Sequence, residues 1–568
     1  MKNLLVAKIL NEIADILEMQ DVEFKPRAYR KAARTVESLS KSIEEVYEEN
    51  KLKELSGVGE SIAEKIAEII ETGTSQYLEK LKKQMPADIE ALTSIEGMGP
   101  KSVKKLYEKL KIKTLDDLAR AAEQHEIRKI KGFGPTTEKN ILEHLELARR
   151  GKERILLGFA MPIANEIKER LKKEKAVSQI EVTGSLRRMK ETIGDIDILV
   201  SSTEPKKVAD FFVSMKNVRE VLGKGVTKCS VILKNNIRVD LRIIKEKSFG
   251  AALMYFTGSK DHNFKLRKIA MSKSYKLNEY GLFKKDNQIA GKTEKEAYRK
   301  LGMDWIAPEL RENRGEIEAA QKHKLPKLIA YDAINGDLQV HTKWSDGGNT
   351  IEEMAEAAKA LGYSYICISD HYSKMKIAGG LNERQIRKEI KEIERINAKI
   401  EDIEILKGAE IDIKADGALQ AKKSVLKELD IVVASVHSNF NQTKKEMTKR
   451  LIAAIESGNV NILGHPTGRK INTKNPSPID MEKLFEASKR TETFLEINAF
   501  PERLDLDDFH ARAAKEAGCK LAINTDAHNR EHLKYMRLGI ATARRGWLNE
   551  NDVINTLPLK GLMKLLKP

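Results

Sequence analysis

The hydrophobic and polar positions of this chain follow different patterns in successive regions. Over residues 1–150, apolar residues recur every three to four positions, which predicts amphipathic helices. Further on, the runs IDILV and NIRVDLRII read as buried strands. From Asp337 onward, short apolar strands such as ICISD, TFLEIN and KLAINTDAH alternate with amphipathic helices, as in an α/β barrel. The pattern therefore predicts several domains of different classes, as the length of 568 residues also does.

Two of the predicted strands carry carboxylates. Asp195 and Asp197 stand two apart at the run IDILV, and Asp240 interrupts the run NIRVDLRII. Because residues i and i+2 share one face of a strand and a buried unpaired carboxylate is costly, the pair predicts a bound cation. Mg²⁺ is expected, and Asp240 supplies the third carboxylate of a two-metal site for phosphoryl transfer. Solvated aspartates at a strand end are the alternative.

The residues before this pair predict a phosphate-binding turn. Gly184 and Ser185 allow backbone amides to approach a phosphate, and Arg187 and Arg188 are placed to pair with its oxygens. A Gly-Ser turn followed by Asp-x-Asp and a later Asp on a strand resembles the nucleotidyltransferase superfamily of the polymerase beta type. The resemblance implies an α+β palm whose three aspartates are catalytic.

The first 150 residues contain a repeated motif. LSGVGESIAEKI, IEGMGPKSVKKL and IKGFGPTTEKNI each place Gly-x-Gly before a predicted helix. Such a turn, together with the helix N-terminus, holds one phosphate without contacting a base. The segments resemble the helix-hairpin-helix motif of DNA repair proteins, and ordinary helix caps are the alternative. The predicted DNA-binding glycines are Gly57, Gly59, Gly97, Gly99, Gly132 and Gly134.

The run FKPRAYRKAA and the phrase GVGESIAEKI are similar to the N-terminal lyase domain of beta-type DNA polymerases. The resemblance implies that Lys65 forms a Schiff base with the sugar of an abasic site, and that Lys25, Tyr29 and Lys53 bind a 5′-phosphate. This chemistry needs a neutral amine, which neighbouring lysines and partial burial favour. Ser61 stands where animal relatives carry another phosphate-binding lysine, so a plain solvated Lys65 is the alternative.

The phrase ALMYFTGSKDHNFKLRKIA is similar to family X DNA polymerases. The resemblance implies that Tyr255 and Phe256 lie against the incoming sugar and favour dNTP over NTP, while Asn263 touches the base. Arg267 would position the template, and Arg238 beside Asp240 would contact DNA. The implied nucleotide-binding residues are Gly184, Ser185, Arg188, Tyr255, Phe256, Gly258 and Asn263.

In the last third of the chain, metal-binding residue types follow the predicted strands. These are His341, Asp346, His371, Glu410, His437, His465, Asp526 and His528. Imidazoles and carboxylates at strand ends suit a multinuclear Mn²⁺ or Zn²⁺ phosphoesterase. The set resembles the PHP (polymerase and histidinol phosphatase) domain, a distorted TIM-like barrel. The family pattern opens with His-x-His, whereas Gln339 stands here in place of the first His, so a degenerate, structural barrel is the alternative.

Charge and cysteine usage add to this picture. Lys and Arg number 102 against 85 Asp and Glu, a net charge of +17. The excess lies before residue 331, which favours a polyanion partner for the first part of the chain. Cys229, Cys367 and Cys519 lie in or near apolar runs and read as core thiols in a reducing compartment. We expect a cytoplasmic protein, because the sequence shows neither a signal peptide nor a membrane span.

The expected domains are a lyase-like helix-hairpin-helix domain (1–85), a fingers-side helix-hairpin-helix module (86–150), a palm (151–260), a thumb (261–325), a linker (326–336) and a PHP domain (337–568). We expect a monomeric repair polymerase, acting in base excision repair, that fills short gaps in 5′-phosphorylated DNA with dNTPs. The PHP domain would act as a 3′–5′ exonuclease or abasic-site endonuclease, and the N-terminal domain as a deoxyribose-phosphate lyase. The alternatives are a polymerase with a structural PHP domain, a template-independent nucleotidyltransferase and a DNA-end-binding scaffold.

Overall fold

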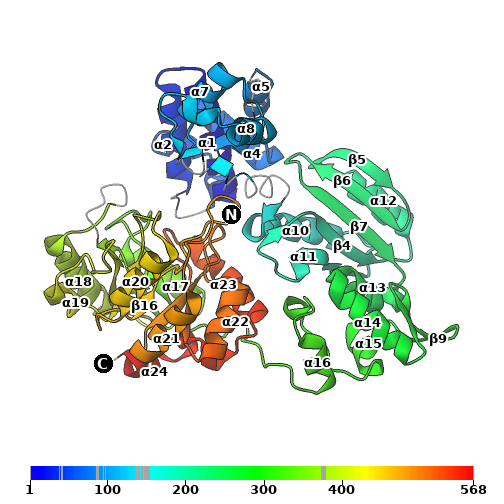
Figure 1. Cartoon of the computed structure of the whole chain (residues 1–568). Helices are drawn as coiled ribbons and strands as arrows, with labels where there is room; N and C mark the ends of the chain where they lie inside the picture. The colour runs from blue at the N-terminus through cyan, green and yellow to red at the C-terminus, as the bar shows by residue number, and fades with distance from the viewer. Residues whose placement is uncertain are drawn as a thin grey trace. The chain divides into compact units, whose positions relative to one another are not determined.

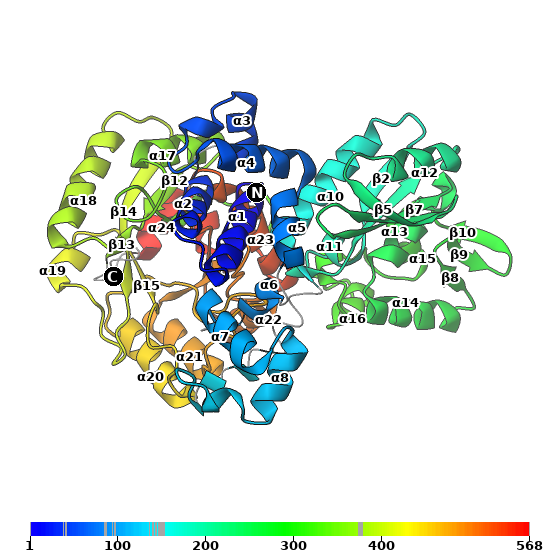
Figure 2. The same cartoon turned by 90° about the horizontal axis from the view of Figure 1, so that it is seen from above.

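The computed structural model describes residues 2–37, 39, 42–84, 88–93, 95, 98–135, 137–138, 141–142, 145, 154–372 and 379–566. Its internal contacts divide the chain into two compact units. One unit combines Met1–Ile70, Gln76–Lys152 and Leu328–Pro568, and the other combines Glu71–Ser75 and Glu153–Lys327. Figures 1 and 2 show the elements of each unit from two directions.

The N-terminal part of the first unit is helical, as its apolar spacing predicts (blue in Figure 1). Its α-helices are α1 (Lys2–Met19), α2 (Lys25–Glu37), α3 (Ile43–Glu48), α4 (Glu60–Thr72), α5 (Gln76–Gln84), α6 (Ile89–Thr93), α7 (Pro100–Leu110) and α8 (Leu115–Glu123). The apolar faces of these helices form one core, to which Leu10, Ile13 and Ile66 contribute fully buried side chains. Helix α8 begins at a capping box in which Thr114 and Asp117 satisfy each other's backbone amides.

A five-stranded sheet in the order β2-β4-β7-β6-β5 is the framework of the second unit. The strands are β2 (Gln179–Val182), β4 (Ile196–Ser201), β5 (Val218–Lys224), β6 (Lys228–Leu233) and β7 (Arg238–Ile244), with a separate pair formed by β1 (Ile155–Leu156) and β3 (Thr192–Ile193). Strands β4 and β7 are the predicted apolar runs, and they lie side by side in parallel. Helices α10 (Leu157–Lys172), α12 (Pro205–Val213) and α13 (Phe249–Thr257) contact the sheet (Figure 1).

The rest of this unit follows α13. It contains α14 (Lys260–Ser272), the antiparallel strands β8 (Lys276–Asn278), β9 (Gly281–Lys284) and β10 (Asn287–Ala290), and helices α15 (Glu294–Lys300) and α16 (Glu316–Gln321). A buried polar group ties its three helices together, because His262 contacts Glu316 through Nδ1 at 2.6 Å and the Tyr298 hydroxyl through Nε2 at 2.9 Å. Burial lowers the pKa of His262, against the opposing effect of Glu316.

The C-terminal part of the first unit is a nearly closed barrel of parallel strands, as the strand–helix rhythm predicts (yellow-green to red in Figure 1). Its strands are β11 (Gly336–Val340), β12 (Tyr365–Ile368), β13 (His371–Tyr372), β14 (Glu404–Asp412), β15 (Ile431–Ser435), β16 (Ile462–Leu463), β17 (Phe494–Asn498) and β18 (Leu521–Asn524). Strand β13 pairs only with β14, and a parallel bridge from Val340 to Ala527 joins the two ends of the sheet.

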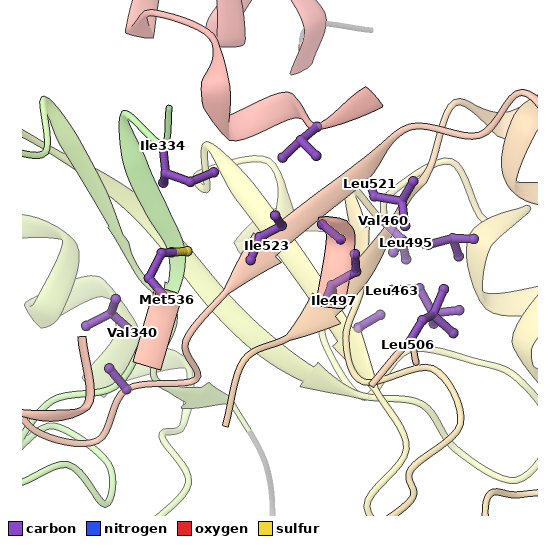
Figure 3. Packing of buried hydrophobic residues seen from close by; sticks show 14 of the residues in the cluster. Ile334, Val340, Val460, Leu463, Leu495, Ile497, Leu506, Leu521, Ile523 and Met536 are labelled. Carbon is purple, nitrogen blue, oxygen red and sulfur yellow. The ribbon is translucent and has the colours of Figure 1, made fainter. Parts of the chain in front are cut away.

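Helices cover the outside of this barrel. They are α17 (Ile351–Ala360), α18 (Glu383–Asn397), α19 (Lys423–Leu426), α20 (Lys444–Ile455), α21 (Met481–Thr491), α22 (Asp508–Ala517) and α23 (Met536–Arg545). Helix α24 (Leu559–Leu566) instead packs Leu562 and Leu566 against the opposite face of the strands. Figure 3 shows Leu495 and Ile497 of β17 with Leu521 and Ile523 of β18 in the core beneath these helices. Alternate residues point to the other face, where Phe494 and Ala522 join a second apolar layer. At the carboxyl ends of the strands, that alternate face becomes polar.

No helix in the described part of the chain has the length and apolar character that crossing a membrane requires. All three cysteines are buried as free thiols, and burial raises the pKa of each of them. The predicted core positions of Cys229, Cys367 and Cys519 are therefore confirmed.

Candidate functional site

The parallel pairing of β4 with β7 brings the three predicted carboxylates of the second unit together. Asp197 lies directly opposite Asp240 in the register, and Asp195 stands one residue before β4 begins at Ile196. Oxygen atoms of the three side chains lie within 4.8 Å of one another. Asp195 and Asp197 are half-buried, and Asp240 is buried. The carboxylates therefore form one cluster at the start of two adjacent strands, although Asp195 itself lies outside the strand that its spacing predicts.

The electrostatics of this cluster fit a divalent cation. Burial, together with the charges of Asp195 and Asp240, raises the pKa of Asp197 to about 7. Asp240 differs, because ion pairs with Arg238 and Lys228 outweigh its burial and hold its pKa low. Three carboxylates this close repel one another, and an oxygen-preferring ion such as Mg²⁺ would remove that repulsion.

The predicted phosphate-binding turn lies against this cluster. It forms the single-turn helix α11 (Gly184–Arg187), in which Gly184 adopts a φ of +62°. A Cβ on Gly184 would lie 3.3 Å from Cγ of Asp197 and closer still to a carboxylate oxygen. Glycine is favoured here because it combines this backbone conformation with this close approach to Asp197, and binding of a phosphate by the turn stays a prediction.

The two arginines after this turn already have anionic partners. Arg187 makes two contacts of 2.8 and 2.9 Å with Glu294 at the start of α15. Arg311 also pairs with Glu294, and the two guanidinium groups hold the pKa of that carboxyl well below its usual range despite burial. Arg188 contacts Glu312 at 3.0 Å. The structure therefore places Arg187 in a buried ion-pair network, whereas sequence reasoning placed it at a phosphate.

Helices α13 and α14 bring together the other predicted nucleotide-binding residues. The rings of Tyr255 and Phe256 meet edge to face at 5.2 Å, and Arg242 of β7 lies over the Phe256 ring at 5.0 Å. Asn263 of α14 donates a 2.6 Å hydrogen bond to the carbonyl of Tyr255. Gly258 joins the helices with a φ of +71°. Of the two predicted DNA-binding arginines nearby, Arg267 is exposed on α14 and Arg238 pairs with Asp240.

The hairpin glycines of the helical region leave backbone accessible. A Cβ on Gly59, Gly99 or Gly134 would meet no described atom within 4 Å, which suits close approach by a phosphate. Gly57 and Gly132 have φ of +80° and +100°, which favour glycine in a tight turn. Gly97 lies outside the described residues.

The predicted lyase residues surround helix α4. The ammonium of Lys65 donates to the carbonyl and hydroxyl oxygens of Ser61, both at 2.9 Å, and lies 4.8 Å from the centre of the Tyr77 ring. Tyr77 in turn stacks on Tyr29, which is buried. Lys25 and Lys53 are exposed, and Lys53 pairs with Glu60. The structure thus leaves both of these lysines at the surface, whereas Tyr29 packs in the interior.

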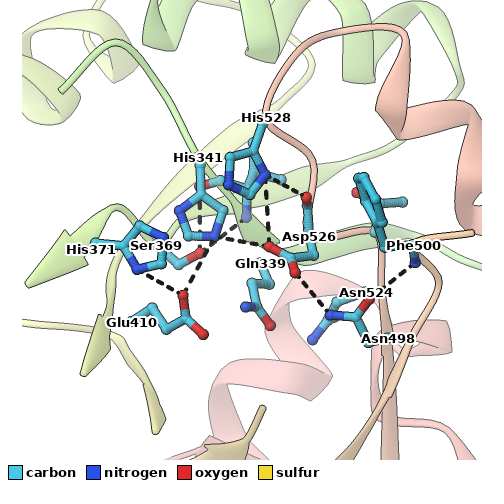
Figure 4. A network of polar contacts seen from close by, with 12 residues as sticks. Gln339, His341, Ser369, His371, Glu410, Asn498, Phe500, Asn524, Asp526 and His528 are labelled. Carbon is cyan, nitrogen blue, oxygen red and sulfur yellow. Dashed lines mark hydrogen bonds and ion pairs between the residues drawn. The ribbon is translucent and has the colours of Figure 1, made fainter. Parts of the chain in front are cut away.

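The predicted metal ligands of the barrel gather at the carboxyl ends of its strands (Figure 4). Two groups have ligand atoms within 4.8 Å of one another, and they share His371. The first comprises His341, Asp346, His371 and His528, and the second comprises His371, Glu410 and His437. His465 joins through a 3.1 Å contact with Glu410, and Asp526 through a 3.2 Å contact with His341. All eight residues therefore form one connected network.

The carboxylates of this network raise the pKa of two of its imidazoles. Burial would lower the pKa of His437, but Glu410 and Asp412 raise it to about 9. His528 also reaches about 9, because Asp346 and Asp526 outweigh its burial. The carboxyl of Glu410 is held well below its usual range, chiefly by His437 and His371 against the effect of burial. Divalent cations would supply the same positive charge and displace these protons.

Gln339 is fully buried among these ligands. Within the described residues, neither its amide oxygen nor its amide nitrogen has a hydrogen-bond partner. Both nitrogens of His341 also lack a hydrogen bond of good geometry in this part of the structure. A buried unpaired polar group costs about 1–3 kcal/mol, so this constellation fits a cation-binding site better than a satisfied core. The donors present are oxygen and imidazole nitrogen, which suit Mn²⁺ or Zn²⁺.

Sequence reasoning missed several polar residues of this site. Glu496 of β17 is buried and accepts hydrogen bonds from the Asn524 side chain at 2.8 Å and the His465 amide at 2.6 Å. Asn498 donates to Glu496 at 3.2 Å and to Asp526 at 3.1 Å. A signal was present, because Glu and Asn alternate with Leu and Ile in FLEIN, and alternate residues of a barrel strand share its interior.

The fold and these two clusters define the class of protein: a nucleotidyltransferase-like unit joined to a barrel of the PHP type. Family models agree. Residues 1–75 match a helix-hairpin-helix domain, 89–147 a SAM-like helix-hairpin-helix tandem, 252–312 the DNA polymerase beta thumb, and 337–499 the PHP domain.

The chain is 39% identical to the DNA polymerase/3′-5′ exonuclease PolX of Bacillus subtilis over 99% of both proteins. It is 34% identical to a probable phosphatase of Thermoanaerobacter sp. (strain X514), over 39% of this chain and 90% of that protein. DNA polymerase lambda of Arabidopsis thaliana is 25% identical over 53% of this chain and 61% of that protein. The chain belongs to the family X DNA polymerases that carry a C-terminal PHP domain.

Proposed function

We propose that this protein is a DNA repair polymerase whose barrel is a metal-dependent 3′–5′ exonuclease. The observation that carries the polymerase assignment is the pairing of Asp197 with Asp240 across β4 and β7, which completes a three-carboxylate cluster beside the Gly184 turn. The full-length similarity to a protein named polymerase and 3′–5′ exonuclease supports both activities.

In the polymerase site, the three aspartates would hold two Mg²⁺ ions. Such ions would supply positive charge, which lowers the pKa of the primer 3′-hydroxyl and neutralises the negative charge of the triphosphate. The amides of the α11 turn are placed to bind triphosphate oxygens, because Gly184 brings that turn against Asp197. Tyr255 and Phe256 lie at the end of α13, where they would contact the sugar, and Asn263 would contact the base from α14.

In the barrel, the eight clustered residues and Gln339 would hold Mn²⁺ or Zn²⁺. Such ions lower the pKa of water and polarise a phosphodiester. Glu410 lies at the centre of the network and orients His371, His437 and His465 through contacts of 3.0 to 3.4 Å. We also propose cleavage at abasic sites, because a phosphodiesterase site of this type does not need an intact base to act on a phosphate.

We also propose a DNA substrate, a cellular compartment and an oligomeric state. We infer gapped or nicked DNA with a 5′-phosphate as the preferred substrate, supported by the open backbone at the hairpin glycines. Three buried free thiols support a reducing compartment such as the cytoplasm. We propose that the protein works as a monomer, since both clusters are built from one chain.

The test is one reaction in which both ends of the DNA are followed. Purified protein is incubated with a gapped, 5′-phosphorylated duplex, dNTPs and either Mg²⁺ or Mn²⁺, and primer length and 5′-end chemistry are measured. We expect filling of the gap with dNTPs and shortening of the 3′ end when dNTPs are omitted. Extension of blunt, template-free ends at the same rate would instead favour a template-independent nucleotidyltransferase. Filling without any shortening would favour a structural barrel.

Lys65 is the proposed lyase nucleophile. Borohydride should trap the protein on DNA that carries an incised abasic site, because reduction fixes the imine. We expect Lys65→Ala to reduce the adduct by at least tenfold, whereas Lys80→Ala on α5 should leave it unchanged. Gel mobility of the covalent adduct is the measurement. Undiminished trapping in Lys65→Ala would show that another lysine is the nucleophile or that the hairpin only clamps phosphate.

Replacing Gln339 by histidine tests the role of the buried amide. An imidazole is a better ligand than a neutral amide for Mn²⁺ or Zn²⁺, so Gln339→His should raise metal affinity on the order of tenfold. Metal content per chain, measured by atomic absorption after dialysis, should rise, and 3′-end degradation should be preserved or faster. Lower metal content in a folded Gln339→His protein would contradict a ligand role for this position.

A further inference from the structure

An aromatic side chain stands at the mouth of the barrel, next to the metal-ligand network. Phe500 follows β17 and lines the same cavity as Asp346, Asp526 and His528. Figure 4 shows it across Asn498 from Asp526. The amide of Phe500 donates to Asn498 at 3.0 Å, and Asn498 donates to Asp526 at 3.1 Å. The position of the ring is therefore tied, through one side chain, to a metal ligand.

Two further aromatic rings pack against the ring of Phe500. Phe500 meets the rings of His532 and Tyr535 edge to face, at 5.4 and 5.5 Å between centroids. His532 and Tyr535 stack on each other at 4.9 Å, so together they form a rigid support. Phe500 is only partly buried and lines the cavity, whose wall also includes Lys31, Arg34 and Thr35 of α2. A rigid, partly exposed aromatic ring beside a phosphodiesterase site is suited to stacking on a nucleobase.

The positively charged side chain of Arg503 lies on the turn that begins at Phe500. The amide of Arg503 donates to the carbonyl of Phe500 at 2.8 Å, and Arg469 fixes the carbonyl of Arg503 at 2.9 Å. The side chain of Arg503 is 20% exposed, lines the cavity, and places Nε 3.7 Å from Asp526. A guanidinium group at this place can donate to a phosphate held at the ligand network.

We propose that the turn from Phe500 to Arg503 is the subsite that receives the last nucleotide of the DNA strand that is degraded. Phe500 stacks on the base, and Arg503 binds the phosphate that is cleaved. This inference rests on the proposed exonuclease activity and adds two substrate-binding residues, one that contacts the base and one that contacts the phosphate.

The test compares two single-stranded oligonucleotides that differ only in their last residue, which carries a base in one and is abasic in the other. KM and kcat for removal of this residue are measured with Mn²⁺. For the wild type, we expect a KM about tenfold lower for the end that carries the base. Phe500→Ala and Phe500→Leu should lose this difference, and Phe500→Trp should keep it. Leucine maintains apolar packing against His532 and Tyr535 but offers no flat ring, so it separates stacking from loss of packing.

Two further variants complete the design. Arg503→Ala should raise KM for both ends by a similar factor, because the phosphate is common to them. Phe509→Ala is the matched control, since Phe509 is 60% exposed on α22 and does not line the cavity; it should retain the wild-type difference. Equal KM values for both ends in the wild type, or an unchanged difference in Phe500→Leu, would overturn the inference while leaving the exonuclease in place. A wild type that degrades neither end would overturn both.

Discussion

Replacing Asp197 by alanine will abolish nucleotide addition and leave DNA binding nearly intact. Asp197 faces both Asp195 and Asp240, so its loss removes a shared ligand from both proposed metal positions. Several kcal/mol of transition-state stabilisation would disappear, which corresponds to about a thousandfold or more in rate. The proposed phosphate-binding hairpins belong to the other unit, so affinity for gapped DNA should change little. Primer extension and a DNA mobility shift measure the two properties.

The matched control for this variant is Asp210→Ala. Asp210 is an exposed carboxylate on α12 that pairs with Lys224, so its removal changes the charge of the unit equally without touching the cluster. Exposed ion pairs of this kind contribute little to stability, because solvent screens them. Extension by Asp197→Ala at a rate near that of Asp210→Ala would show that the cluster is not the polymerase site.

Replacing Asp526 by alanine will stop DNA cleavage and leave gap filling unchanged. Asp526 contacts His341 at 3.2 Å and accepts a hydrogen bond from Asn498 at 3.1 Å, so several proposed ligands lose their partner with it. We expect a loss of at least about a hundredfold in 3′-end degradation with Mn²⁺. His437→Ala should behave in the same way, since His437 contacts Glu410.

Two controls accompany this variant. Asp402→Ala removes a carboxylate whose side chain is 81% exposed in the same unit, and it should cleave as the wild type does. Gap filling by Asp526→Ala confirms that the rest of the chain is folded. Equal 3′-end degradation by Asp526→Ala and Asp402→Ala would trace the nuclease to a contaminant or to another site. A wild type that degrades neither ends nor abasic sites with Mn²⁺, Zn²⁺ or Mg²⁺ would make the barrel structural.

The sequence predicted the fold class of each region because the periodicity of apolar residues differs between a helix, a strand and a βα repeat. It also predicted which residues gather at the carboxyl ends of the barrel strands, since these ends meet at one edge. The pairing of Asp197 with Asp240 depends on the tertiary structure. Spacing shows that each lies on an apolar strand, but only the register of β4 with β7 places them opposite each other.

The ion-pair and stacking partners of individual side chains could not be predicted from the sequence. Arg187 and Arg188 follow a Gly-Ser turn, which favours phosphate, but Glu294 and Glu312 come from elements far along the chain. The resemblance to the lyase domain implies that Tyr29 binds phosphate, whereas the structure packs its ring on Tyr77. Contacts of this kind depend on tertiary packing, which no local pattern encodes. The roles of these residues in binding stay predictions.

The ion pair between Arg188 and Glu312 has a consequence for the order of events at the polymerase site. Arg188 cannot direct its Nε to a triphosphate while that atom contacts Glu312 at 3.0 Å. If Arg188 binds the triphosphate, as the resemblance implies, nucleotide binding and release of Glu312 would be thermodynamically linked, and the carboxylate would compete with the incoming anion. Such competition would raise the apparent Kd for the nucleotide, because each binding event has to replace one ion pair with another.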